Sequence, residues 1–81
     1  MNFITQDTTE SDKLLFFGEN EEFEIIENHW IMAHVMHKAG IFPSISQAKK
    51  NGWNIPIPDG FSIFTIGKKK HQVFIFKEIK D

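Results

Sequence analysis

Two stretches near the end of the chain are rich in β-branched and aromatic residues, which favours strands. They are Phe61 to Ile66 and Gln72 to Lys77. The polar residues between them, Gly67 to His71, are typical of a hairpin loop, because glycine tolerates the positive φ of a tight turn. The pattern therefore predicts two antiparallel strands that close the domain.

The middle of the chain carries apolar residues at intervals of three and four, the spacing of an α-helix. One set is Phe23, Ile26, Trp30, Ala33 and His37, and a second set is Met32, Val35, Met36 and Ala39. We expect a helix from about Asn28 to Ala39. Before it, Glu22 to Glu27 has two interpretations. Either the helix begins earlier, or the segment is extended with Phe23 and Ile25 on one face and Ile26 on the other.

Stop and restart signals follow this helix directly. Gly40 suits the left-handed position just past a helix C-terminus, and Pro43 holds Phe42 in an extended conformation. Ser44 and Gln47 have the spacing of a capping box, in which each side chain bonds the other residue's amide. We expect two helices that meet at a corner here.

The second helix runs from Ser44 to about Lys50 and ends at Asn51-Gly52. Two prolines exclude a helix from the link that follows, and Pro58-Asp59-Gly60 is typical of a tight turn before the first predicted strand.

Residues 1–10 are mostly polar, with only Phe3 and Ile4 to bury. We interpret them as a loose arm or an edge segment of a single domain that spans residues 1–81. Next, Ser11 with Asp12 is able to cap a short helix stopped by Gly18, but the apolar run Leu14 to Phe17 suits a buried strand as well. Both interpretations stay open.

Length and composition limit the fold. Eighty-one residues make one small domain, and without cysteine neither disulfides nor thiolate metal sites add stability. Nine phenylalanines and two tryptophans supply the core instead. We expect an α+β fold with a helix corner packed on a small antiparallel β-sheet that ends in the C-terminal hairpin. No apolar run approaches the roughly 20 residues of a membrane span, and no signal peptide is present, so we expect a cytoplasmic protein without a membrane partner.

Charge divides the chain in two. Residues 1–37 carry eight carboxylates and one lysine, whereas residues 38–81 carry eight lysines and three carboxylates. The chain contains no arginine, so it lacks the guanidinium fork that binds phosphate with two hydrogen bonds. The protein is therefore a charge dipole along its sequence.

Neither catalysis nor metal binding is indicated. The sequence has no Ser-His-Asp, Cys-His or paired-carboxylate arrangement, so we expect no enzyme activity and no cofactor. His34 and His37 share a helix face, but only His71 and Glu27 would complete a zinc site with them. We expect no metal.

The segment Ala39 to Lys50 resembles the alpha-L motif of the S-four RNA-binding domain family. Both read as a helix, Ala-Gly, an apolar pair, Pro-Ser, and then Ser-Gln-Ala-Lys-Lys at the start of the next helix. The segment Ile66 to Phe76 is similar to the family's last strand pair, whose turn commonly reads Gly-Lys-Lys. The chain departs from the family where Ile45 replaces a frequent arginine and where Asn51-Gly52 ends the second helix early. In size and acidic first half it also resembles small uncharacterised proteins of large bacteriophages.

The resemblance implies a non-enzymatic module that binds structured RNA or another phosphate-bearing ligand. The residues it assigns to this surface are Ser44, Ser46, Gln47, Lys49 and Lys50, with Lys68, Lys69 and Lys70 nearby. Lysines neutralise phosphates, and amides at the Ser44 helix start are able to bind a phosphate oxygen. Trp53 is able to stack on a base if exposed, or else packs in the core.

An alternative function uses the acidic half of the chain. It is a protein-interaction or inhibitor protein of the phage type, which binds a basic partner. The residues that would contact this partner are Glu19, Glu21, Glu22, Glu24 and Glu27.

Overall fold

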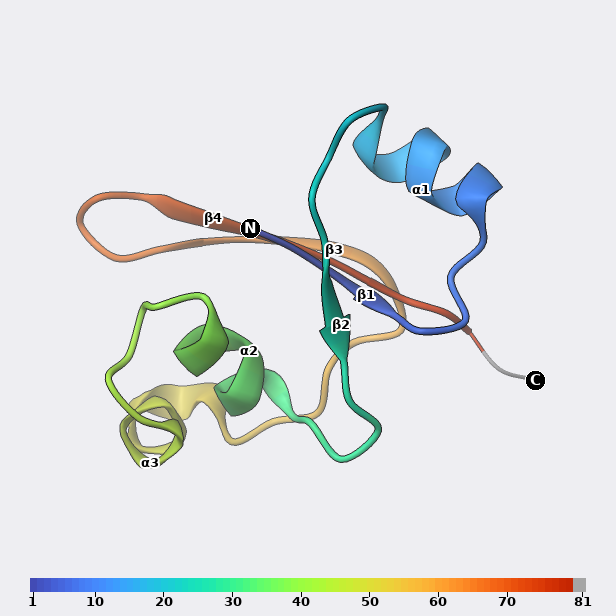
Figure 1. Cartoon of the computed structure of the whole chain (residues 1–81). Coiled ribbons are helices and arrows are strands. Elements are labelled where there is room, and N and C mark those ends of the chain that lie inside the picture. Colours follow the sequence, from blue (N-terminus) through green and yellow to red (C-terminus); the bar gives the residue numbers. More distant parts are fainter. Residues whose placement is uncertain (80–81) are drawn as a thin grey trace.

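The computed structural model describes residues 1–79 and confirms a small α+β fold (Figure 1). In chain order the elements are β1 Asn2–Thr5, α1 Glu10–Phe17, β2 Glu24–Ile26, α2 Met32–Lys38, α3 Ile45–Ala48, the π-helical turn η1 Lys49–Trp53, β3 Gly60–Ile66 and β4 His71–Lys77. Among the described residues, no helix is long and apolar enough to cross a membrane.

The four strands form one mixed sheet in the order β2-β1-β4-β3. β3 and β4 pair antiparallel, with Gly60 opposite Lys77 and Ile66 opposite His71, which confirms the predicted hairpin. The rest of the sheet differs from the antiparallel sheet that we expected, because β1 pairs in parallel with both β2 and β4. Helix α1 returns the chain between β1 and β2, and β3 returns it before β4, so the three parallel strands start at the same end of the sheet.

Residues 2–5 lie in the middle of the sheet and not in a loose arm. Phe3 and Ile4 are 0% and 2% exposed, and they point to opposite faces of β1. Two apolar residues are enough to anchor a four-residue strand when both faces of the sheet are covered and both strand edges are paired. The sequence analysis counted both Phe3 and Ile4, but two such residues in a mostly polar segment did not indicate a central strand.

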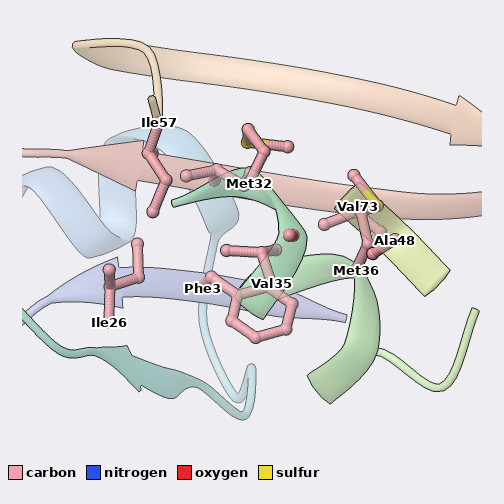
Figure 2. Close-up of a cluster of buried hydrophobic side chains, with 10 residues drawn as sticks. Phe3, Ile26, Met32, Val35, Met36, Ala48, Ile57 and Val73 are labelled. Atoms are coloured by element: carbon pink, nitrogen blue, oxygen red, sulfur yellow. The ribbon is translucent and has the colours of Figure 1, made fainter. Parts of the chain in front are cut away.

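The main core lies between one face of the sheet and the helices α2 and α3. Phe3, Val73 and Ile75 of the sheet meet Met32, Val35, Met36 and Ala48 of the helices, with Ile26 and Ile57 beside them (Figure 2). Burying one such side chain stabilises the fold by about 1.5–3 kcal/mol. This cluster fixes α2 and α3 on the sheet.

Helix α1 lies on the opposite side of the sheet from α2 and α3 (Figure 1). The Phe16 ring stacks on Phe61 and Phe76, with centroids 5.1 Å and 4.7 Å apart. The Phe17 ring meets Phe61 and Phe23 edge to face. This face of the sheet is less completely covered, because Ile63 on β3 stays 54% exposed.

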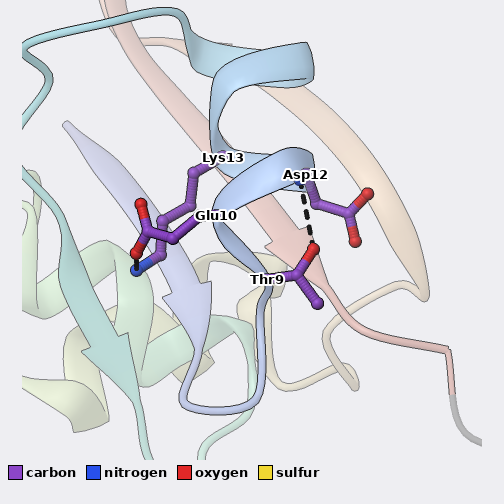
Figure 3. Close-up of polar contacts among 4 residues, drawn as sticks. All are labelled: Thr9, Glu10, Asp12 and Lys13. Atoms are coloured by element: carbon purple, nitrogen blue, oxygen red, sulfur yellow. Dashed lines mark hydrogen bonds and ion pairs between the residues drawn. The ribbon is translucent and has the colours of Figure 1, made fainter.

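The segment that precedes Gly18 is a helix and not a strand. The cap is Thr9, two residues before the predicted Ser11, because its Oγ1 accepts a hydrogen bond from the Asp12 amide at 3.2 Å (Figure 3). Glu10 pairs with Lys13 at 3.0 Å on the same turn. Gly18 ends the helix as predicted, with φ at 85° and its amide bonded to the Leu14 carbonyl.

Helix α2 is shorter than predicted. It begins at Met32 and not near Asn28, because the Ile31 amide donates to Nδ1 of His34 at 3.0 Å and the Met32 amide donates to the carbonyl of Ile55 at 2.9 Å. His34 thereby caps the helix from its third position, where glutamate or glutamine is usual. Before it, the extended interpretation is correct, because Glu24–Ile26 form β2.

The corner between α2 and α3 has the predicted glycine stop and the Ser44 half of the predicted capping box, but among residues 1–79 no hydrogen bond joins the Gln47 side chain to the Ser44 amide. Gly40 takes a φ of 81°, and the Gln47 amide donates to Ser44 Oγ at 3.1 Å. The α-helix ends at Ala48 and continues as η1, where Gly52 adopts a φ of 93°. The Trp53 ring then packs edge to face against Phe64, 5.7 Å between centroids, and is half-buried.

Candidate partner-binding site

A hollow of about 830 Å³ opens beside the N-terminus, and we name it the acidic hollow. Its apolar lining comes from Met1, Phe23 and Phe74. Its polar lining comes from Asn2, Asn20, Glu21, Glu22 and Glu24. Three acidic residues and two phenylalanines therefore line one concave surface.

Strand register explains why Asn2 and Phe74 form the floor of the hollow. They lie side by side on β1 and β4. Phe3 and Ile75, the next pair along, face the main core, so Asn2 and Phe74 face the side that carries α1. Helix α1 covers this side near Phe76 and leaves the part of the sheet around Phe74 open.

Phe23 forms an aromatic side of the hollow and is fixed from the direction of α1. Its ring meets Phe17 edge to face at 5.1 Å, and Lys13 Nζ lies 5.9 Å from its centroid. The ring is half-buried and reaches the hollow from the segment just before β2. The Phe23 ring on this side of the hollow is thus fixed by its contacts with α1.

Hydrogen bonds join the acidic residues Glu21 and Glu22 to the central strand β1. Asn2 Nδ2 donates to Glu21 Oε2 and to the Glu22 carbonyl, each at 3.1 Å. At the rim, the N-terminal ammonium of Met1 donates to the Gln72 carbonyl at 3.1 Å. The residues that line the hollow thus include three glutamates and this one ammonium.

Not all of the predicted acidic residues join this site. Glu21, Glu22 and Glu24 line the hollow, whereas Glu19 is an exposed residue of the preceding turn and is not part of the lining. Glu27 lies at a smaller hollow of about 280 Å³, which the ends of β1, β2 and β4 form with the residues that follow β2 and β4 and with the segment before β3. Sequence reasoning found the acidic segment but missed its aromatic partners, since nothing in the sequence places Phe74 beside Asn2.

The smaller hollow contains its own ion pair. Lys77 Nζ lies 3.4 Å from Asp59 Oδ1 and donates to the Ile57 carbonyl. Glu78 also lines it, and burial, together with the carboxylates of Asp12 and Asp7, raises the pKa of Glu78 above its usual 4.5. Within residues 1–79, Glu78 Oε2 is buried and accepts no hydrogen bond.

The residues predicted to bind phosphate fall into two groups. Ser46, Gln47, Lys49 and Lys50 are exposed on α3 and η1, and Lys68, Lys69 and Lys70 are exposed in the hairpin loop. In Figure 1 the hairpin loop and the α2–α3 corner lie at the same end of the molecule. Ser44 Oγ is occupied as a helix cap, and Trp53 packs on Phe64.

Two of the four histidines, His29 and His34, lie close together near the start of α2. The His34 ring lies 5.5 Å from His29 and stacks on Trp30 at 6.0 Å between centroids. Burial is the largest cause that lowers the pKa of His34. Charge repulsion from His29 also lowers it, and Lys49 and His37 have smaller effects in the same direction. Among residues 1–79, no three His, Asp or Glu side chains form a group able to hold a metal ion.

Comparisons of the chain with protein-family models, curated proteins and solved structures found no match. The function must therefore be inferred from the surface itself.

Proposed function

We propose that this protein is a non-enzymatic binding module, and that its acidic hollow holds a basic segment of a partner protein. The observation that carries the proposal is the meeting of Glu21, Glu22 and Glu24 with the rings of Phe23 and Phe74 in one hollow. This combination matches a segment in which lysine or arginine alternates with apolar side chains.

Charge and aromaticity act together in this arrangement. A cation that enters the hollow gains attraction from the carboxylates, and the face of a phenylalanine ring adds about 0.5–1 kcal/mol at an exposed site. The apolar part of the partner covers ring surface that is exposed to water in the free protein. Each Å² of apolar surface removed from water stabilises the complex by about 25 cal/mol. Complementary charge also speeds the encounter, so association is expected to slow as salt rises.

Asn2 prepares the site before a partner arrives. Its side chain holds Glu21 and the backbone at Glu22, so less conformational freedom is lost on binding. The acidic hollow is in this sense a preformed site built on a central strand.

A titration with a defined probe tests the proposal. The probe is a short blocked peptide in which lysine alternates with leucine, and its binding is measured by calorimetry at low and at moderate salt. We expect wild type to bind, and the triple variant Glu21→Gln, Glu22→Gln, Glu24→Gln to lose about tenfold or more in affinity, since roughly 1.4 kcal/mol corresponds to tenfold.

A matched variant separates the hollow from general charge. Glu10→Gln, Glu19→Gln, Glu27→Gln removes the same number of carboxylates from residues outside the lining of the hollow. This variant should bind the probe almost as wild type does. Equal losses in the two triple variants, or binding of a control peptide with glutamate in place of lysine, would contradict the proposal.

A second candidate function is the binding of structured RNA through the lysine-rich end, as the S-four resemblance implies. It is favoured by the position of the hairpin loop and the α2–α3 corner at one end of the molecule (Figure 1). Ile66 at the end of β3, and Ile41 and Phe42 in the corner, pack against the same core cluster, which supports this placement.

Salt-dependent RNA retention tests this candidate. Replacement of Lys49, Lys50, Lys68, Lys69 and Lys70 by glutamate should abolish retention of a structured RNA at low salt. Wild type that retains no structured RNA at low salt would exclude it. The two candidates are distinguishable, because the acidic hollow variants carry every lysine.

A further inference from the structure

The outer edge of β3 has no paired strand among the described residues. β3 is an end strand of the sheet and pairs only with β4 among residues 1–79. It is seven residues long, whereas the strand at the other end, β2, has three and begins with a glutamate. The two edges of the sheet are thus unequal.

Hydrogen bonds in the sheet identify the backbone groups on this edge. The Phe74 amide donates to the Met1 carbonyl and the Gln72 carbonyl accepts from the N-terminus, so these residues of β4 turn towards β1. Their neighbours on β4, including Val73 and Ile75, turn towards β3 and meet Phe64 and Ser62.

The alternate residues of β3 therefore present their N–H and C=O groups outwards. They are Phe61, Ile63 and Thr65. Such a row of unpaired groups is a template for another strand, and soluble proteins usually protect it with lysine, proline or a bulge inside the strand. The sequence Gly-Phe-Ser-Ile-Phe-Thr-Ile of β3 contains no charged residue and no proline.

We propose that two copies of this chain associate by antiparallel pairing of their β3 strands, with Ile63 of one copy against Ile63 of the other. Ile63 is the middle residue of the outward-facing set, so this register pairs Phe61 of each copy with Thr65 of the other. The two sheets join into one across a two-fold axis, which makes the contact self-complementary.

Charge at the two ends of β3 favours the antiparallel direction. Asp59 precedes the strand and is exposed, and Lys68 and Lys69 follow it in the hairpin loop. Antiparallel pairing centred on Ile63 lays Asp59 of one copy beside the loop of the other. Parallel pairing would instead place like charges together, which is unfavourable.

The apolar surface around Ile63 also gains from this pairing. Ile63 is 54% exposed and lies opposite Phe74 on the incompletely covered side of the sheet. A second copy brings another Ile63 and Phe61 to this position. The association uses the β3 edge and does not depend on the acidic hollow.

Amide hydrogen exchange of the wild-type protein tests the proposal without any substitution. The amides of Phe61, Ile63 and Thr65 should become protected as the concentration rises to about 1 mM, and they should exchange freely in dilute solution. Those of Ser62 and Phe64 bond to β4 and should be protected at both concentrations, which gives an internal control. Free exchange of the outward amides at every concentration would overturn the proposal.

Sedimentation equilibrium of variants provides the second arm. Ile63→Lys places two cations together at the two-fold axis, and Thr65→Pro removes an outward N–H that the β3–β4 ladder does not use. Each should raise the dimer Kd about tenfold or more. The control Leu15→Lys changes a 75% exposed residue of α1 and should dimerise as wild type does. A wild type that stays monomeric, or a dimer that persists in both β3 variants, would overturn the proposal. If a β3 variant does not fold, the exchange experiment decides.

Discussion

The side-chain amide of Asn2 holds the carboxylate of Glu21, with Nδ2 3.1 Å from Oε2. The same nitrogen donates to the carbonyl of Glu22. This contact joins the central strand of the sheet to the acidic segment before β2, although the residues are far apart in sequence. It makes the second residue of the chain part of both the fold and the proposed site.

Replacing the side chain of Asn2 should lower both the stability of the fold and the affinity of the proposed site. Asn2→Ala removes two exposed hydrogen bonds, so we expect the free energy of unfolding to fall by about 1 kcal/mol. Affinity for the lysine-leucine peptide should fall as well, since Glu21 is no longer held. Denaturation and calorimetry measure the two effects. Asn54→Ala, at an exposed position between η1 and β3, is the control, and equal behaviour of the two variants would contradict the role of Asn2.

Phe3 should be among the most sensitive positions of the chain. It is fully buried on a strand paired at both edges, so Phe3→Ala should cost about 3–5 kcal/mol. A small domain has about 5–15 kcal/mol in total, so urea should unfold this variant at a much lower concentration. Leu15→Ala, at an exposed position, should change the midpoint little. An unchanged midpoint for Phe3→Ala would mean that residues 2–5 are a loose arm after all.

The stability of the protein should depend on pH through His34. Folding lowers the pKa of His34 below its usual 6.5, so the unfolded chain takes up the proton first as the pH falls. The free energy of unfolding should therefore decrease from about pH 6.5 downwards, until the pH passes the lowered pKa. Protonation also removes the Nδ1 lone pair that accepts the Ile31 amide.

The variant His34→Gln tests this effect, because glutamine keeps an acceptor at the third helix position and does not titrate. Its thermal midpoint should vary less than that of wild type between pH 7 and pH 5, a range around the usual pKa of about 6.5. His71→Gln changes an exposed histidine at the start of β4 and should leave the wild-type pH dependence unchanged. If the thermal midpoint of His34→Gln varies with pH as much as that of wild type, another group causes the effect.

The pH dependence of stability that comes from Glu78 should have the opposite sign to that of His34. Folding raises its pKa above the usual 4.5, so the ionised form is disfavoured in the folded protein and stability is lost as the pH rises through the raised pKa. Glu78→Gln should therefore raise the melting temperature at neutral pH. The gain should vanish below about pH 4.5, where both states are protonated. Glu19→Gln is the control, and an equal gain there would contradict this account.

The elements with local signals were the ones that sequence reasoning predicted well. The β3–β4 hairpin follows from two apolar runs around a glycine and three lysines, and the Ser44 cap follows from a spacing of three residues. The predicted start of α2 was wrong because the Ile31 amide donates a hydrogen bond to His34, a residue that is rarely interpreted as a helix cap.

Non-local pairing is what the sequence could not specify. Parallel pairing of β1 with β4 joins residues more than 70 positions apart, such as Asn2 and Phe74, and no pattern within either segment indicates the partner. For the same reason the acidic residues were predicted as one surface, whereas the structure separates Glu27 from Glu21, Glu22 and Glu24.

Chemical-shift mapping with the lysine-leucine peptide tests the central claim most directly. In a titration followed by amide NMR, we expect the largest changes at Asn2, Glu21, Glu22, Phe23 and Phe74, the residues of the acidic hollow. The hairpin loop and α3 should change little. Changes spread evenly over every acidic residue, or confined to the smaller hollow around Glu27, would contradict the claim that the acidic hollow is the binding site.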